Sequence, residues 1–287
     1  LLLLIAWWLG LAPGWYLISG LVTILLGAAD DVRHVPWQVK LTVQLVLVAY
    51  ISTIFWGSFD TITFYNHSFP VTQIFLLAIF LFWFVGIFNA VNLLDGLDGL
   101  AGGFMVLVCI GAALAGNGTF AQLNFVLATL LLGFLVFNQR ISKLFMGDAG
   151  SLFLGFHIAV MPLLFAESMP FSTILHTTPF VLLATYLVAD TTRVFFTRLA
   201  VKKSPMTADT IHFHHVILQQ SGSYLASIGS IYFITLITAL FAAFSFSNLL
   251  SVNFMMGHLA LLLIFILTPP IQTYVPLFTR LLNPFYS

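Results

Sequence analysis

The segment from residue 89 to residue 103 holds the densest group of side chains suited to chemistry. Asn92, Asp95 and Asp98 recur at intervals of three, so on a helix they would drift only slowly around one face. The glycines among them would let backbone or a bound group approach closely. An Asx-rich turn would not explain so many carboxylates and amides. The spacing of an EF-hand calcium loop is also absent.

Two more acidic motifs occur at the ends of apolar stretches. Asp30 and Asp31 stand side by side, so one pKa rises unless a cation holds both carboxylates ionised; a solvated helix end is the simpler alternative. Asp148 opens a later stretch, where it could serve only as an N-cap. Gly147 and Gly150 beside it leave room for a phosphate to meet backbone N–H groups.

The groups that could face these acids are basic or aromatic. Lys40, Asn138 and Lys143 lie near the acidic motifs, and His212, His214 and His215 follow Lys202 and Lys203. Without cysteine partners or an HExxH helix, the histidines suit phosphate better than zinc. Phe145 could be a membrane-interface aromatic or a platform for a base. Asp190 and Arg193, three positions apart, predict a buried pair facing protein.

The composition indicates the elements that must position these residues. The chain has 287 residues, of which 61% are hydrophobic and 6% charged. Since a membrane-spanning helix needs about 20 apolar residues, we expect a single all-α polytopic membrane domain over residues 1–287. About ten spans are expected, the first partial: 1–11, 15–29, 39–56, 72–91, 100–116, 121–137, 151–166, 177–199, 226–246 and 253–270. Only residues 57–71 alternate in a way that predicts a hairpin.

The charges predict an orientation for these spans. All nine basic residues lie in or beside alternate connections, which the positive-inside rule places in the cytoplasm. The acidic and histidine motifs fall in the same connections and should converge there. The formal net charge of zero argues against nucleic acid as a partner. We therefore expect a multi-pass protein in the lipid bilayer, with its active site at the cytoplasmic surface.

Acids that hold Mg²⁺ opposite basic groups that hold a diphosphate form a scheme for phosphoryl transfer. The location implies that one reactant is a lipid. An intramembrane ion or proton carrier is an alternative, but it predicts polar residues throughout the bilayer depth. A membrane scaffold is a third reading, which would not need the Asn-Asp-Gly cluster.

Four ordered motifs resemble those of the polyprenyl-phosphate N-acetylhexosamine-1-phosphate transferases. They are the Asp30-Asp31 pair with Lys40-Leu-x-x-Gln44, Asn89-x-x-Asn92-x-x-Asp95-Gly-x-Asp98-Gly, Asn138 with Phe145-Met-Gly-Asp148-x-Gly-Ser151, and His212-x-His214-His215. The chain is most similar to the bacterial undecaprenyl-phosphate N-acetylglucosamine branch. The resemblance implies that a UDP-sugar and a polyprenyl phosphate give a polyprenyl-diphospho-sugar and UMP, with Mg²⁺, or Mn²⁺ in its place. It implies a place in the bacterial inner membrane and leaves a homodimer open.

The resemblance also implies roles for the residues. Asn92 and Asp148 would ligate the metal. The catalytic set would be Asp30, Asp31, Lys40, Asp95, His212, His214 and His215, with Asp30 or Asp31 acting on the lipid phosphate as base or as electrostatic guide. Asn89, Asp98, Asn138, Lys143 and Phe145 would bind substrate, with Asp98 and Phe145 at the uracil. Direct attack by the lipid phosphate and a covalent aspartyl intermediate both stay open.

The sequence departs from the family pattern in three places. The family's first transmembrane helix and the basic segment after it have no counterpart here. Ile141-Ser142 replaces a frequent Pro-Ala, and Ala208 and Thr210 flank Asp209 where the family usually has Pro and Arg. These changes affect the expected sugar-nucleotide contacts, so the same transfer with another UDP-N-acetyl sugar or with UDP-MurNAc-pentapeptide is the alternative.

Overall fold

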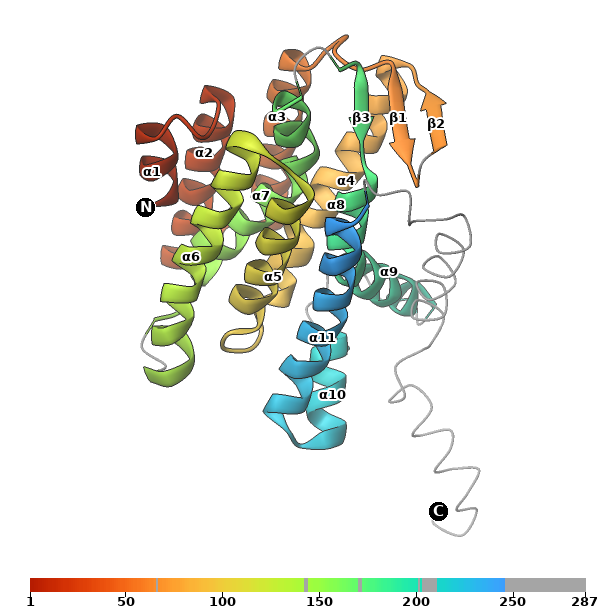
Figure 1. Cartoon of the computed structure of the whole chain (residues 1–287). Helices are drawn as coiled ribbons and strands as arrows, with labels where there is room; N and C mark the ends of the chain where they lie inside the picture. Colours follow the sequence, from red (N-terminus) through yellow and green to blue (C-terminus); the bar gives the residue numbers. More distant parts are fainter. Residues whose placement is uncertain (66, 142–143, 170–171, 201, 203–210, 246–287) are drawn as a thin grey trace.

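The computed structural model describes residues 1–65, 67–141, 144–169, 172–200, 202 and 211–245. Most of this part is helical (Figure 1). The helices are α1 (Leu2–Trp8), α2 (Gly14–Val32), α3 (Trp37–Ile54), α4 (Gln73–Leu94), α5 (Leu100–Ala115), α6 (Gly118–Ile141), α7 (Gly147–Glu167), α8 (Thr178–Leu183), α9 (Thr185–Ala200), α10 (Phe213–Ser221) and α11 (Tyr224–Ala243). The strands are β1 (Thr61–Phe64), β2 (His67–Pro70) and β3 (Ile174–His176).

Six of the described helices are long and apolar enough to cross a membrane: α2, α3, α4, α6, α7 and α11. Helix α5 is equally apolar but has only 16 residues. The expectation of a helical, multi-pass membrane protein is confirmed in this respect. The span expected at 253–270 lies outside the described residues, so the number ten stays a prediction.

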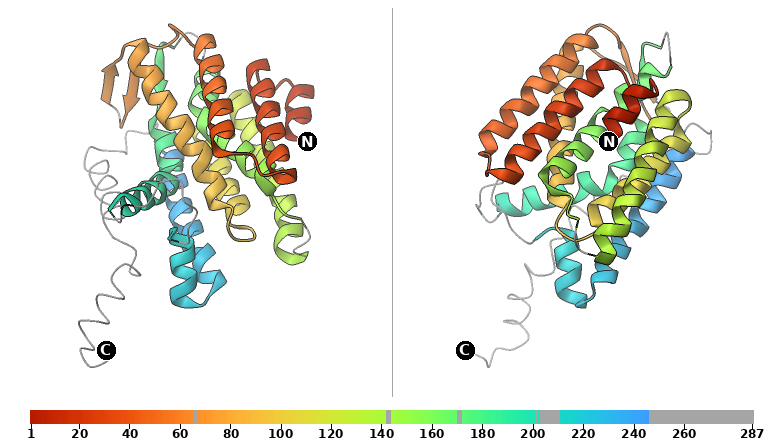
Figure 2. Two further views of the ribbon diagram at one scale, coloured as in Figure 1. Left: turned by 180° about the vertical axis from the view of Figure 1, so that it is seen from behind. Right: turned by 90° about the vertical axis from the view of Figure 1, so that its left-hand side faces the viewer.

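The stretch 177–199, expected as one span, is not a single helix. It is interrupted at Ala184 (φ −89°, ψ 3°) into the short α8 and the more polar α9. Beyond the interruption α9 runs across the direction of the other long helices (Figures 1 and 2). The polar residues of α9, Asp190 and Arg193 among them, explain why it does not continue as a lipid-facing span.

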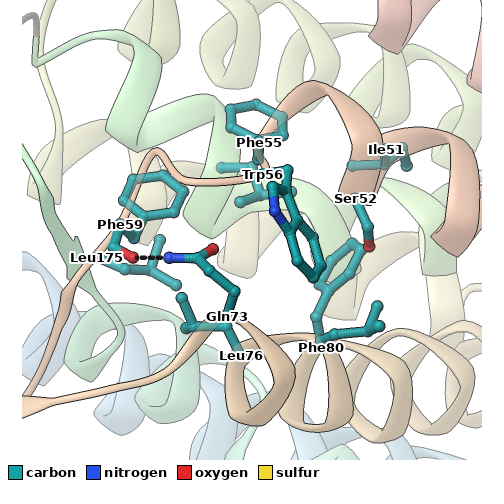
Figure 3. Close-up of a pocket in the computed structure, with 11 residues that line it drawn as sticks. Ile51, Ser52, Phe55, Trp56, Phe59, Gln73, Leu76, Phe80 and Leu175 are labelled. Atoms are coloured by element: carbon teal, nitrogen blue, oxygen red, sulfur yellow. Dashed lines mark hydrogen bonds between the residues drawn. The ribbon is translucent and has the colours of Figure 1, made fainter.

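The hairpin expected within residues 57–71 is confirmed. Strands β1 and β2 pair antiparallel, and β3 joins β1 in parallel, so the sheet order is β2-β1-β3. Beside the sheet, residues of α3, α4 and the connection between α3 and β1 line a small apolar cavity of about 60 Å³ (Figure 3). Gln73 Nε2 donates to Phe59 O at 2.7 Å across it. The sheet and this cavity lie at one end of the molecule.

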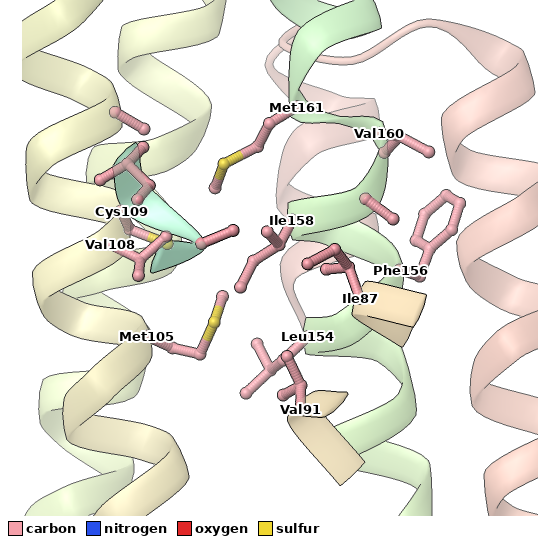
Figure 4. Packing of buried hydrophobic residues seen from close by; sticks show 14 of the residues in the cluster. Ile87, Val91, Met105, Val108, Cys109, Leu154, Phe156, Ile158, Val160 and Met161 are labelled. Atoms are coloured by element: carbon pink, nitrogen blue, oxygen red, sulfur yellow. The ribbon is translucent and has the colours of Figure 1, made fainter. Parts of the chain in front are cut away.

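Helix α7 occupies the centre of the helical core and is buried along most of its length. Its apolar side chains pack with those of α4 and α5, including Met105, Cys109 and Met161 (Figure 4). Two glycines permit close crossings with α7: a Cβ on Gly27 would lie 2.4 Å from Ala149 Cα, and one on Gly155 would lie 2.5 Å from Phe88 O. These crossings fix α2 and α4 against α7, which carries Asp148.

Three polar side chains inside this core are paired with one another. Tyr16 Oη lies 2.8 Å from His157 Nδ1, and His157 Nε2 lies 3.1 Å from Asn124 Oδ1. This chain of contacts joins α2, α7 and α6 where apolar surroundings give polar groups no water to bond. Both ring nitrogens of His157 are therefore hydrogen-bonded within the core.

Candidate active site

The ends of α2, α4 and α6 and the beginnings of α3, α5 and α7 lie at the end of the molecule opposite the sheet (Figures 1 and 2). Five carboxylates come from this end. We call them the acidic cluster: Asp30, Asp31, Asp95, Asp98 and Asp148. The three histidines at the start of α10 are called the histidine cluster: His212, His214 and His215.

Asp31 holds the first turn of α7. Its Oδ1 accepts from the backbone N–H of Asp148 at 2.7 Å, and its Oδ2 accepts from that of Ala149 at 3.1 Å. An anion is stabilised at a helix N-terminus, where N–H groups have no partner within the helix. Gly147, with φ +64°, allows this approach, since a Cβ there would lie 2.8 Å from Asp31 Oδ2. The carboxylate of Asp31 thus uses two of the amides at which a phosphate was expected, and phosphate binding there stays a prediction.

Both carboxylate oxygens of Asp30 accept hydrogen bonds, one from the connection between α2 and α3 and one from α3 itself. Its Oδ1 accepts from Val35 N at 2.6 Å, and Lys40 Nζ donates to its Oδ2. The Asp30 side chain is only 2% exposed. Lys40 Nζ also lies 3.6 Å from Asp148 Oδ2. Lys40 thus bridges α2 and α7 and brings a positive charge between two acids.

Asn92 connects α4 to the acidic end of α7. Its Nδ2 donates to Asp148 Oδ1 at 2.8 Å and to Ser151 Oγ at 2.9 Å. These bonds use its amide N–H groups and leave its amide oxygen available. The predicted metal residues Asn92 and Asp148 are therefore adjacent. Within the described part of the chain, no three His, Cys, Asp or Glu side chains are close enough to hold a metal ion among themselves.

Asp95 and Asp98 lie in the turn between α4 and α5. Asp95 is the C-cap of α4, and Gly99, with φ 77°, begins α5. Burial raises the pKa of Asp95 to about 6, and the negative charges of Asp148, Asp98 and Asp31 add to the effect. The acidic cluster therefore carries unfavourable like charge that a bound cation would relieve.

The histidine cluster faces the same turn. A Cβ on Gly96 would lie 3.0 Å from His214 Nε2 and 3.3 Å from His215 Nε2. The rings of His212 and His214 are nearly parallel, with centroids 5.9 Å apart. Burial lowers the pKa of His214 to about 3, with His215 contributing next. The structure thus brings His214 and His215 to Gly96, immediately after Asp95.

Helix α11 supports both sides of this contact. Tyr224 Oη donates to Asp98 O, and Tyr232 Oη donates to Gly99 O at 2.6 Å. Ser227 Oγ donates to His214 O at 2.7 Å. Sequence reasoning missed these three residues. The sequence signal that could have found them is the presence of hydroxyl side chains in the first half of an otherwise apolar helix.

Asp190 connects α9 to the histidine cluster. The predicted pair with Arg193 is confirmed, with Arg193 NH2 2.8 Å from Asp190 Oδ1. Asp190 Oδ2 also lies 2.8 Å from His212 Nδ1, a contact that the sequence did not predict. The separation of 22 residues left no local pattern for it.

The remaining predicted residues are placed less directly. Asn89 exchanges hydrogen bonds with Gln44 at 3.2 and 3.0 Å and holds α3 against α4. Asn138 Nδ2 donates to Leu144 O at 2.8 Å, which closes the connection leading to Phe145. Phe145 is 70% exposed. Lys143 lies outside the described residues. Substrate contact by any of the four stays a prediction.

An apolar groove of about 520 Å³ runs between α4 and α9. It is lined by Phe82, Trp83, Ala90, Leu187 and Thr191, among others. Ala90 lies two residues before Asn92, and Thr191 follows Asp190. Along the chain, the groove residues are therefore close to Asn92 and Asp190.

Residues 14–166 match the model of glycosyl transferase family 4. The chain belongs to this family. The match covers α2 to α7 and so includes the whole acidic cluster, whereas the histidine cluster lies beyond it. The resemblance drawn from the motifs is confirmed at the level of the family.

Curated relatives agree with this assignment. A probable undecaprenyl-phosphate N-acetylglucosaminyl 1-phosphate transferase of Bacillus subtilis is 32% identical over 232 residues, 78% of this chain and 63% of the relative. An undecaprenyl-phosphate alpha-N-acetylglucosaminyl 1-phosphate transferase of Thermotoga maritima is 29% identical over 73% of this chain and 63% of the relative. A phospho-N-acetylmuramoyl-pentapeptide-transferase of Staphylococcus carnosus is 41% identical over 36% of this chain and 33% of the relative. The chain thus spans less than two thirds of the length of these relatives.

Proposed function

We propose that this family 4 protein transfers a sugar-1-phosphate from a UDP-sugar to undecaprenyl phosphate and releases UMP. N-acetylglucosamine-1-phosphate is the favoured group, in line with what the Bacillus and Thermotoga relatives are named for. The reaction would begin cell-surface polysaccharide synthesis, such as that of O-antigen, at the cytoplasmic face of the bacterial inner membrane. The observation that carries the proposal is the Asp30–Lys40–Asp148–Asn92 array at the end of apolar helices.

The residues present fit a Mg²⁺ ion. Asp148 supplies a carboxylate and Asn92 an amide oxygen. Burial raises the pKa of Asp95, and the negative charges of Asp148, Asp98 and Asp31 raise it further, so a cation would be stabilised here. Mg²⁺ in enzymes of phosphate chemistry is held by one or two carboxylates, with water and substrate phosphates completing the shell. A site with few protein ligands agrees with this preference. When bound, the ion would neutralise the diphosphate during transfer.

The hydrogen bonds favour direct attack by the lipid phosphate. Both oxygens of Asp30 are engaged by Lys40 and Val35, and both oxygens of Asp31 are engaged by α7 amides. A covalent intermediate on Asp30 or Asp31 would have to break those bonds. In the direct route, an oxygen of the lipid phosphate bonds to the phosphorus that carries the sugar. The bond from that phosphorus to the bridging oxygen breaks, and UMP leaves with the bridging oxygen.

The surrounding residues would then bind different parts of the two substrates. Lys40 offsets charge on the phosphates, and the histidine cluster faces them across the turn that carries Asp95. Phe145 offers an exposed ring for the uracil, and Asp98 a hydrogen-bond acceptor. The groove between α4 and α9 is apolar and accessible, which suits the polyprenyl chain.

The deciding experiment is UMP release by the purified protein in detergent with undecaprenyl phosphate and a panel of UDP-sugars. We expect turnover with UDP-N-acetylglucosamine, loss of turnover with EDTA, and recovery with Mg²⁺, or with Mn²⁺ in its place. Turnover only with UDP-MurNAc-pentapeptide would move the protein to the other branch that the Staphylococcus relative represents. Folded protein that releases no UMP with any donor would overturn the proposal.

A further inference from the structure

Asp190 joins α9 to the residues just before α10 through a set of buried contacts. Its Oδ2 lies 2.8 Å from His212 Nδ1, and its Oδ1 accepts from Phe213 N at 3.0 Å and from Arg193 NH2 at 2.8 Å. Arg193 also donates to Ile211 O at 2.6 Å. The Asp190, Arg193 and His212 residues are 3–5% exposed. Asp190 and Arg193 together therefore fix residues 211–213 to α9.

The contact with Asp190 decides which nitrogen of His212 carries a proton. An ionised carboxylate only accepts hydrogen bonds, so Nδ1 must be the donor. The other nitrogen, Nε2, is buried and has no hydrogen-bond partner among the described residues. A buried polar atom without a partner costs about 1–3 kcal/mol, so its presence needs an explanation. A ligand that enters the site and bonds to Nε2 supplies one.

The position of His212 supports such a ligand contact. Its ring lies nearly parallel to that of His214, whose Nε2 faces Gly96 in the turn of the acidic cluster. Both ring nitrogens of His214 are also buried without a partner in the described part of the chain. Arg193 balances the charge of Asp190, so the pair can support His212 without adding net negative charge to the site.

We propose that Asp190 is a positioning residue, which holds His212 with Nδ1 protonated and so presents Nε2 as a hydrogen-bond acceptor to a hydroxyl or N–H group of the sugar in the substrate. This inference rests on the proposed function. Asp190 acts through His212 and does not itself touch the substrate. An Asn at this position would keep the size of the side chain, but its NH₂ group could face Nδ1 and favour the other tautomer.

The test is a double-mutant cycle on UMP release. Asp190→Asn should lower kcat about 10- to 100-fold, as expected when the carboxylate behind a functional histidine is lost. His212→Gln should cause a similar loss. The double variant should be no worse than His212→Gln alone, because residues that act as a unit are not additive. Thr197→Val serves as the control: its hydroxyl bonds only to Arg193 O on the same helix, so kcat should not change.

A second measurement does not need turnover. ¹⁵N chemical shifts of labelled histidine, assigned by comparison with His212→Gln, should show Nδ1–H at His212 in the wild type and a changed tautomer in Asp190→Asn. If the wild type releases no UMP but the tautomer depends on Asp190, the proposed function fails while the positioning contact stands.

Three results would overturn the inference. One is a folded Asp190→Asn protein with kcat within about twofold of the wild type. Another is a double variant whose loss of kcat equals the product of the losses in Asp190→Asn and His212→Gln. If Asp190→Asn does not fold, Asp190→Glu carries the same cycle, because it keeps the charge beside Arg193. Failure of both variants to fold would assign Asp190 a structural role alone.

Discussion

The acidic cluster and the histidine cluster satisfy their polar groups in opposite ways. In the acidic cluster, Asp30 and Asp31 are fully engaged by Lys40 and by backbone N–H groups, and Asp148 bonds to Asn92. In the histidine cluster, His212 Nε2 and both nitrogens of His214 have no partner among the described residues. Hydrogen bonds within the protein therefore fix the carboxylates of Asp30, Asp31 and Asp148 before a substrate binds. The histidine cluster has hydrogen-bonding capacity in reserve, which a ligand would use.

The largest effect on activity is expected from a substitution of Asp148 in the acidic cluster. Asp148→Asn removes the carboxylate beside Asn92 and Lys40, so we expect UMP release to fall by at least about 10²-fold, as when a main electrostatic group is lost. Thermal stability should change little, because Asn still offers an oxygen to Asn92 Nδ2. Asp60→Asn, the same change near the sheet, should leave activity intact. Near-normal turnover by Asp148→Asn would contradict the metal assignment.

The next effect separates the two helices that carry the acidic cluster. In Gly27→Ala, the new Cβ would meet Ala149 and Asp148 backbone atoms at 2.4 Å, so α2 and α7 must move apart. Overpacking of this kind costs about 1–3 kcal/mol, and the contact of Asp31 with α7 should lengthen. We expect a lower thermal midpoint and a lower kcat.

The matched control for Gly27→Ala is Gly133→Ala. Gly133 also lies within a long helix, but a Cβ there meets nothing within 4 Å. It should leave activity unchanged and stability equal or higher, since Ala favours helix by about 1 kcal/mol over Gly. If both substitutions behave alike, the α2–α7 crossing is not what positions Asp148.

A smaller effect should distinguish the two substrates. Phe145→Ala removes an exposed ring three residues before Asp148, and stacking on a base is worth about 1–3 kcal/mol. We expect the KM for the UDP-sugar to rise more than the KM for undecaprenyl phosphate. Phe137→Ala is the control, because Phe137 is also exposed but lies on α6. Equal changes in both KM values would assign Phe145 to packing.

The smallest effect concerns the histidine cluster in the absence of substrate. The pKa of His214 is lowered from 6.5 to about 3, so the unfolded chain binds a proton there at a higher pH than the native state does. The free energy of unfolding should therefore decrease as pH falls from about 7 to about 5. His214→Gln should weaken this dependence in thermal melts. An unchanged pH dependence in His214→Gln would show that the native state does not keep this imidazole neutral.

Much of the fold could be predicted because apolar stretches of span length leave helices as the natural solution in lipid. The hairpin was also predictable from its alternation. The interruption at Ala184 was not, because it lies within an apolar stretch with no proline or glycine next to it. The separate helix α10 was missed for a related reason: a short helix that packs on others needs no span-length pattern.

The candidate site was predictable in its members but not in their partners. Asp30 and Asp31 are adjacent, yet successive helical residues point about 100° apart. One therefore meets Lys40 from α3 and the other meets the amides of α7. Likewise, the i, i+3 spacing predicted the pair of Asp190 and Arg193, whereas the contact with His212 depends on how α9 and α10 pack.

The cap that Asp31 places on α7 has a consequence for inhibitor chemistry. A helix N-terminus is usually an attractive docking point for an anionic warhead, but here the compound would have to displace a carboxylate already bonded to two amides. The histidine cluster makes no such demand. A competitive inhibitor should therefore gain more affinity from an uncharged group that bonds to the imidazoles than from a phosphate mimic that binds the N-terminus of α7.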